Sequence, residues 1–241
     1  LVYLLRHRDI FSWSRTALRL RAEKVRSILN IGIPCAIQMT VAGISWLVVT
    51  YLINDYGVAY SAANGFAVKI KDFSMMFITA VSTAASSMIA QNLGARQYER
   101  SKAILYSAMR MTLLMSVVLI VLVELGAPFL MGLFTNEADV IAAGTLNLRV
   151  EIVGQIFYAI FLVYHALMLG AGDTWWVFLS SFANCIVFRV VLSILFEHFW
   201  GVEGIYAACA IAPSISVPVG MYYTRSNRWR KSLAKPAREG E

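Results

Sequence analysis

Long apolar segments with few charged residues alternate with short polar turns along almost the whole chain. The pattern predicts six such segments, which cover residues 27–54, 62–95, 103–134, 140–169, 175–196 and 204–224. An α-helix rises about 1.5 Å per residue, so roughly 20 apolar residues cross the ~30 Å hydrocarbon core of a bilayer. Each segment is long enough to do so. The sequence therefore predicts an all-α fold, a polytopic membrane protein built as a six-transmembrane-helix bundle.

Small residues and prolines indicate where individual segments should pack closely or break. Residues 73–95 carry no charge, and their second half is rich in alanine, serine and threonine. In lipid, small side chains let helix backbones approach one another, so this segment is expected to pack against its neighbours. In the last segment, Pro213 and Pro218 are expected to kink or break the helix.

The charged residues are few and unevenly placed. They make up 15% of the chain, against about a quarter of a soluble domain, and 59% of the residues are hydrophobic. Of the 21 Lys and Arg residues, seven lie in 1–30, four in 96–110 and six in 225–241, and the turns near residues 55, 137 and 200 have none. Because basic loops stay on the cytoplasmic side, we expect a multi-pass plasma-membrane protein with both ends of this chain in the cytoplasm. The net charge of +7 reflects this bias, and no base-reading motif accompanies it, so no nucleic-acid partner is expected.

The same charge pattern divides the chain into three parts. Residues 1–30 are expected to hold the end of a truncated transmembrane helix and a basic amphipathic linker along the cytoplasmic interface. Residues 31–224 form the six-helix lobe in the lipid bilayer, and residues 225–241 form a basic cytoplasmic tail. The chain is accordingly interpreted as a fragment of a longer protein.

Five polar or charged residues in or beside the spans are candidates for a substrate or ion pathway. They are Gln38, Lys69, Asp72, Glu151 and Arg189. Charged groups at membrane depth are costly and usually face a cavity or a partner. In one interpretation, Glu151 is a proton- or cation-responsive carboxylate that lines the cavity, and Arg189 sets its pKa. In the other, Glu151 pairs locally with Arg149 or extends outward to the membrane surface, and Arg189 only joins helices. Lys69 and Asp72 share a helix face and are either part of the pathway or a structural pair.

Neither an enzyme active site nor a metal centre is predicted. The sequence has no nucleophile–base constellation and no metal-ligand cluster, and Cys35, Cys185 and Cys209 lie in apolar spans without a CxxC partner. His165 is interpreted as a packing residue, with a proton relay as the alternative. No cofactor is expected apart from a coupling ion, Na⁺ or H⁺.

Five short motifs occur in order along the chain. They are Gly32-Ile33-Pro34 with Gln38, Ala67-Val68-Lys69-Ile70 with Phe73, Gln91-Asn92-Leu93-Gly94-Ala95 with Glu99-Arg100, Leu133-Phe134-Thr135, and Gly170-Ala171-Gly172-Asp173-Thr174. Together they resemble the C-terminal half of the multidrug and toxic compound extrusion (MATE) transporters. The resemblance covers nearly the whole chain.

The resemblance implies twelve helices in two six-helix lobes, of which this chain is the second and the N-terminal lobe is the missing partner. Such lobes enclose a central cavity and rock against each other for alternating access. It also implies MATE-type multidrug efflux, a secondary antiport of small organic cations or other xenobiotics against Na⁺ or H⁺. Some members carry an acidic residue in the first span of this lobe for cation coupling, whereas residues 27–54 have none here.

Two other functions stay open on the sequence alone. Arg189 suits a flippase of lipid-linked saccharides, whose pyrophosphate is anionic, whereas Glu151 suits the export of cationic drugs. The chain is alternatively a non-transporting membrane scaffold subunit.

Overall fold

The computed structural model describes residues 22–232, which are almost entirely helical and contain no strand. The first helices are α2 (Ala22–Asn54), α3 (Val58–Gly94), α4 (Tyr98–Gly132), α5 (Ala138–Val153) and α6 (Gln155–Gly170). They are followed by α7 (Thr174–Phe182), the π-helical segment η1 (Ala183–Val190), α8 (Val191–Trp200), α9 (Val202–Ile211), the 3₁₀ segment η2 (Ala212–Ile215), α10 (Ser216–Arg225) and α11 (Trp229–Ser232). Much of the predicted linker and tail, in residues 1–21 and 233–241, lies outside the described range.

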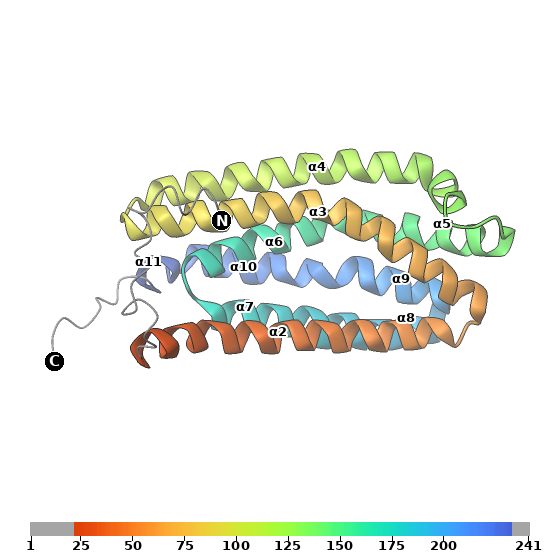
Figure 1. The fold of residues 1–241 in the computed structure, drawn as a ribbon, viewed down its shortest axis with the longest axis horizontal. Helices are drawn as coiled ribbons and strands as arrows, with labels where there is room; N and C mark the ends of the chain where they lie inside the picture. The colour runs from red at the N-terminus through yellow and green to blue at the C-terminus, as the bar shows by residue number, and fades with distance from the viewer. Residues whose placement is uncertain (1–21, 233–241) are drawn as a thin grey trace, which may run out of the picture.

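The helices run lengthwise, with their connections gathered at the two ends of the molecule (Figure 1). Five stretches are long and apolar enough to span a membrane: Gly32–Asn54, Val58–Gly94, Tyr98–Gly132, Thr174–Trp200 and Val202–Arg225. Helices α5 and α6 form one further span, which is bent by 46°. The predicted all-α bundle of six spans is therefore confirmed. The second span begins a few residues earlier than the apolar pattern indicates.

Helix α3 lies against α4, α5 and α6 and so joins the largest part of the bundle. Its covered face includes Ala67, Ile78 and Ala85, which are almost completely buried. Ser82, on the same face, donates a hydrogen bond of 2.6 Å to the backbone carbonyl of Leu162 on α6. The small-residue half of α3 thus packs against its neighbour as predicted, although only on one side.

Three spans are interrupted near their middle, and two of the interruptions have an identifiable cause. A Cβ atom at Gly154 would lie 2.5 Å from backbone atoms of Ala210 on α9, so only glycine permits the close contact at the bend between α5 and α6. Pro213 lies in the first turn of η2, which confirms the predicted break in the last span, because proline lacks the N–H that continues an α-helix. The third interruption is η1, which borders the pocket described below.

The last described helix is fastened to the first turn of α4. The indole of Trp229 is buried, and its N–H donates a hydrogen bond of 3.1 Å to the carbonyl of Thr224. The Arg230 guanidinium lies 2.9 Å from the Glu99 carboxylate and also covers the ring of Tyr98. These contacts hold α11 against the bundle.

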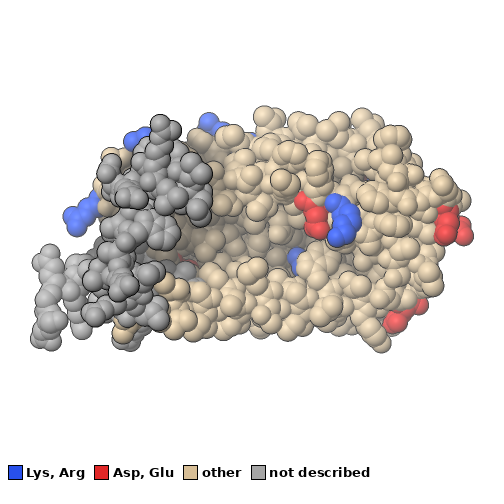
Figure 2. Space-filling view, in the orientation of Figure 1, with Lys and Arg blue, Asp and Glu red and all other residues tan. Residues whose placement is uncertain are grey.

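Charge and apolar surface are distributed as a bilayer requires. The α2–α3 and α4–α5 connections, at one end in Figure 1, carry Asp55 and Glu137, whereas Arg96 and Arg228 lie in connections at the opposite end. Figure 2 shows acidic groups near one end of the molecule and basic groups near the other. Between the ends, large apolar side chains such as Leu125 of α4 point outward. An apolar belt of this kind is suited to contact with lipid.

Candidate functional site

A partly enclosed pocket of about 350 Å³ lies inside the bundle, with walls from every span except α4. Four of the five predicted site residues line it: Gln38 on α2, Asp72 on α3, Glu151 on α5 and Arg189 on η1. Lys69 is exposed, does not line the pocket, and makes no ion pair with Asp72 in the described part of the chain. Figure 2 shows the hollow on this face of the bundle, with a basic group visible inside it.

Lys71 and Glu151 form a buried ion pair across the pocket wall. Each side chain is only 6% exposed, and the Lys71 ammonium donates a hydrogen bond to one carboxylate oxygen of Glu151. The other carboxylate oxygen has no hydrogen-bond partner within residues 22–232. Glu151 does not pair with Arg149, as one alternative proposed, because Arg149 points away and lies 3.7 Å from Glu124. The interpretation of Glu151 as a pocket-lining carboxylate fits this geometry, and its role in transport stays a prediction.

Lys71 is a pocket residue that the sequence reasoning passed over in favour of Lys69. The helical period explains the difference, because residues three, four and seven apart share one helix face. Ala67, Lys71, Ser74 and Ile78 follow this spacing, and all four are buried. A count of the apolar period along α3 would have placed Lys71 inside and Lys69 outside.

Arg189 is the second buried cation of the pocket. It is 5% exposed, and its guanidinium lies over the ring of Trp46, 4.8 Å from the ring centroid. The Lys71 ammonium lies 5.5 Å from the same ring. No carboxylate in the described residues lies within 4.0 Å of Arg189, and its Nε has no hydrogen-bond partner there. Arg189 therefore joins helices through the indole ring and not through an ion pair.

The π-helical segment places Arg189 toward the pocket. Hydrogen bonds in a π-helix join residues five apart, and Asn184 and Arg189, which have this spacing, are both buried and line the pocket. The Ser45 hydroxyl on α2 donates a hydrogen bond of 2.7 Å to the carbonyl of Cys185. This contact ties η1 to α2 and keeps the two elements in register at the pocket.

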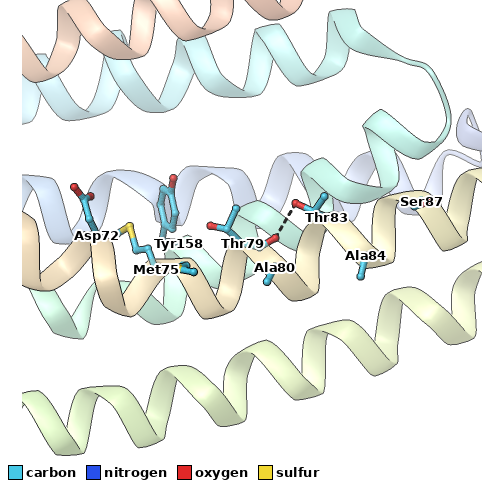
Figure 3. A pocket seen from close by; sticks show the side chains of 9 residues that line it. Asp72, Met75, Thr79, Ala80, Thr83, Ala84, Ser87 and Tyr158 are labelled. Atoms are coloured by element: carbon cyan, nitrogen blue, oxygen red, sulfur yellow. Dashed lines mark hydrogen bonds between the residues drawn. The ribbon is translucent and has the colours of Figure 1, made fainter. Parts of the chain in front are cut away.

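An open groove continues from the pocket along the uncovered face of α3. Asp72, Met75 and Tyr158 line both the pocket and the groove, which then follows Thr79 and Thr83 toward the basic end of the helix. Figure 3 shows Asp72, Met75, Thr79 and Thr83 along α3, with Tyr158 of α6 beside them. The Thr83 hydroxyl donates a hydrogen bond of 2.8 Å to the carbonyl of Thr79. The predicted residue Asp72 thus stands where the enclosed pocket meets the open groove.

The remaining candidate, His165, lies outside the pocket. Its ring is 5% exposed and stacks at a tilt on Phe161, with 4.0 Å between the ring centroids. Its Nε2 has no hydrogen-bond partner among the described residues. In the same part of the chain, no cluster of three or more His, Cys, Asp or Glu residues is arranged to hold a metal ion.

Comparison with known proteins places this architecture in a family. The MatE family model matches residues 34–195. The chain is 22% identical to the probable multidrug resistance protein YoeA of Bacillus subtilis over 229 residues, which is 92% of this chain and 50% of that protein. It is 21% identical over 235 residues to the multidrug export protein MepA of Staphylococcus saprophyticus, covering 98% of this chain and 52% of MepA.

Solved structures show the same fold. The Vibrio cholerae MATE transporter VcmN in its bent form superimposes with a TM-score of 0.86 at 18% identity, over 95% of this chain and 52% of VcmN. A transporter of the MOP superfamily from Pyrococcus furiosus, described as having a binding pocket of reverse polarity, gives a TM-score of 0.83 at 18% identity, over 96% of this chain and 54% of that one.

The chain spans about half the length of the curated relatives it matches. Because the MatE family model matches more than half of its residues, this chain belongs to the MatE family.

Proposed function

We propose that this chain forms one lobe of a multidrug exporter that antiports small organic cations and other xenobiotics against Na⁺ or H⁺. A second lobe of similar size, the N-terminal lobe of the relatives' architecture, would complete the cavity that the pocket and the groove open into. The matched relatives named as multidrug resistance and export proteins support this proposal. So does a polar pocket within an apolar bundle.

The observation that carries the proposal is the buried Lys71–Glu151 pair in the pocket wall. Taking two opposite charges out of water costs more than their attraction commonly returns. In a membrane segment, ionisable residues that face a cavity generally mark an ion or substrate route. Together with Asp72 at the rim, the pair supplies carboxylates that an organic cation or a coupling ion can reach.

The free oxygen of Glu151 is a place where a coupling cation can bind. This carboxylate oxygen has no hydrogen-bond partner among the described residues, and H⁺ or Na⁺ that binds there competes with the Lys71 ammonium for the same negative charge. The two gradients are therefore tested separately.

We further propose that the protein lies in the plasma membrane with both ends of this chain in the cytoplasm. The α2–α3 and α4–α5 connections carry acidic residues and no Lys or Arg, and the opposite end carries the basic residues. Basic connections remain on the cytoplasmic side during insertion.

Gradient-driven flux tests the transport proposal. The protein, expressed from its complete reading frame, is reconstituted in liposomes, and ethidium movement is followed under a pH gradient or a sodium gradient alone. We expect flux driven by one of the two gradients, and we expect Glu151→Gln to lower it by roughly tenfold or more, because the exchange carboxylate is gone.

Glu124→Gln is the matched control, since Glu124 lies in the same lobe and pairs with Arg149 outside the pocket. It should retain flux at equal protein content. Flux that ignores both gradients, or equal flux from Glu151→Gln and Glu124→Gln, would contradict the proposal.

Flipping of lipid-linked saccharides is the second candidate, favoured by the buried Arg189, which has no ion-pair partner among the described residues. Its test is the transfer of a fluorescent lipid pyrophosphate between the leaflets of the same liposomes. Ethidium flux without lipid transfer would exclude it. A scaffold subunit would show neither activity.

A further inference from the structure

The charges of the pocket do not balance among its buried residues. Lys71 and Arg189 are buried cations, and Glu151 is the one buried anion in the pocket wall of the described chain. Lys71 already neutralises Glu151. Asp72 is exposed at the rim and forms no ion pair with a described residue. Arg189 is therefore left as a buried positive charge without a counter-ion.

The contact between Arg189 and Trp46 does not use the hydrogen-bond donors of the guanidinium. A cation over an aromatic face is attracted to the π-electrons, whereas the five N–H groups of arginine lie in the guanidinium plane. The Nε–H group of Arg189 is buried and has no hydrogen-bond partner among the described residues. The planar fork of arginine matches the two oxygens of a carboxylate or a phosphate.

Neighbouring polar groups on the same wall also lack partners. Ser181 and Asn184 are each 1% exposed and line the pocket with Arg189. The Ser181 hydroxyl and the Asn184 carbonyl oxygen have no hydrogen-bond partner among the described residues. Buried polar groups are nearly always satisfied in folded proteins, so the free donors of Arg189 and Ser181 on one pocket wall indicate a ligand that supplies hydrogen-bond acceptors.

We infer that this pocket binds the anionic group of an amphiphilic compound, a carboxylate or a phosphate, with Arg189 as its principal binding residue. The Ser181 hydroxyl donates a supporting hydrogen bond. The apolar body of the compound lies against Trp46, Phe161 and Met75, which also line the pocket. The inference rests on the proposed function, because it treats this pocket as a substrate site, and it extends the substrate class from cations to anionic and zwitterionic amphiphiles.

Equilibrium binding of two matched probes tests the inference on the unmodified protein. Dansyl-phenylalanine carries a free carboxylate, and its methyl ester has the same aromatic body without the charge. The protein from the complete reading frame is placed in phosphatidylcholine nanodiscs, and dansyl fluorescence is titrated. We expect the acid to bind about tenfold or more tightly than the ester, the value of one charge-assisted hydrogen-bonded contact.

Substitutions identify the binding residue. Arg189→Gln should abolish the preference, so that the acid and the ester bind this variant equally. Arg189→Lys, which keeps the charge but not the planar fork, should retain part of the preference. Arg149→Gln is the matched control, because Arg149 is an arginine of the same lobe that pairs with Glu124 outside the pocket, and it should keep the full preference.

Two competitors separate the sources of the anionic group. If phenyl phosphate displaces the acid and phosphatidylglycerol in the nanodisc does not, the site binds free anions. Displacement by phosphatidylglycerol assigns it to a lipid headgroup, and either result supports the inference. Equal binding of acid and ester, no binding of either, or a preference that survives Arg189→Gln overturns it.

Flux measurements distinguish this failure from failure of the transport proposal. Gradient-driven ethidium flux with no preference for the acid leaves the exporter proposal standing and removes the anion site. A preference for the acid without any flux supports the anion-site inference and contradicts the exporter proposal.

Discussion

At the scale of single residues, the pocket depends on a few charged side chains that have lost almost all contact with water. Glu151 and Arg189 could be predicted as pocket residues because each is an isolated charge inside an apolar segment. Their partners could not be predicted in this way, because they come from other helices. Glu151 pairs with Lys71, 80 residues away, and Arg189 lies over Trp46 on α2.

Removal of Lys71 should be far more harmful than removal of an exposed lysine. Lys71→Met leaves Glu151 buried without its counter-ion, which should lower the free energy of unfolding by about 3–5 kcal/mol. Thermal unfolding of the purified protein in detergent, followed by fluorescence, measures the change. Adding Glu151→Leu to Lys71→Met removes the stranded charge and should restore most of the stability.

Lys102→Met is the control for this prediction. Lys102 lies 3.7 Å from Glu99, whose side chain is 80% exposed, so its loss should cost no more than about 1 kcal/mol. If Lys71→Met and Lys102→Met unfold at the same temperature, the buried pair is not a stability element.

At the scale of helices, the spans could be read from the apolar pattern, but only one of the three interruptions could. Pro213 predicts its own break because the missing N–H is a local property. The bend at Gly154 depends on the approach of Ala210 from α9, and residues 140–169 look continuous without that knowledge. The π-helical segment η1 lies within the apolar segment 175–196, where no proline or glycine indicates a break, and it contacts α2 through the hydrogen bond from Ser45 to Cys185.

Gly154→Ala should destabilise the lobe, because its new methyl group would overlap the backbone of Ala210. Overpacking of this kind costs about 1–3 kcal/mol, and the backbone atoms that it meets cannot turn aside as a flexible side chain would. The same thermal unfolding assay measures the loss.

Gly65→Ala is the matched substitution on α3, where a Cβ atom would meet nothing within 4 Å. It should leave stability unchanged or raise it by up to about 1 kcal/mol, since alanine favours helix more than glycine. An equally stable Gly154→Ala variant would show that the bend does not depend on close backbone contact.

At the scale of the whole molecule, the number of crossings and the separation of charge could be predicted from composition along the chain. The way in which the spans surround a pocket could not, because each helix contributes only a few residues to it, such as Gln38 from α2 and Glu151 from α5. Which face of α3 stays open also depends on the neighbouring helices. The residues that a second lobe would contribute to a complete cavity could not be predicted from this sequence either.

Cysteine labelling tests the orientation. In a variant without the three native cysteines, a single cysteine replaces Tyr56 in the α2–α3 connection or Arg228 in the α10–α11 connection, at opposite ends of the bundle (Figure 1). A membrane-impermeant maleimide added to intact cells should label position 56, because connections without Lys or Arg are expected outside. Position 228 should react only after the cells are opened. Labelling of both positions from the same side would contradict the six-span arrangement.

The bridge from Arg230 to Glu99 also decides where a reporter can be attached to this protein. An epitope tag or fluorescent fusion that replaces the chain from residue 229 onward would delete the buried Trp229 indole and the Arg230 guanidinium together, and it would uncover Tyr98 at the start of α4. A low yield of such a fusion protein would then reflect the loss of the contacts between α11 and α4, and not a failure to insert into the membrane. Fusions placed after residue 241 keep both side chains.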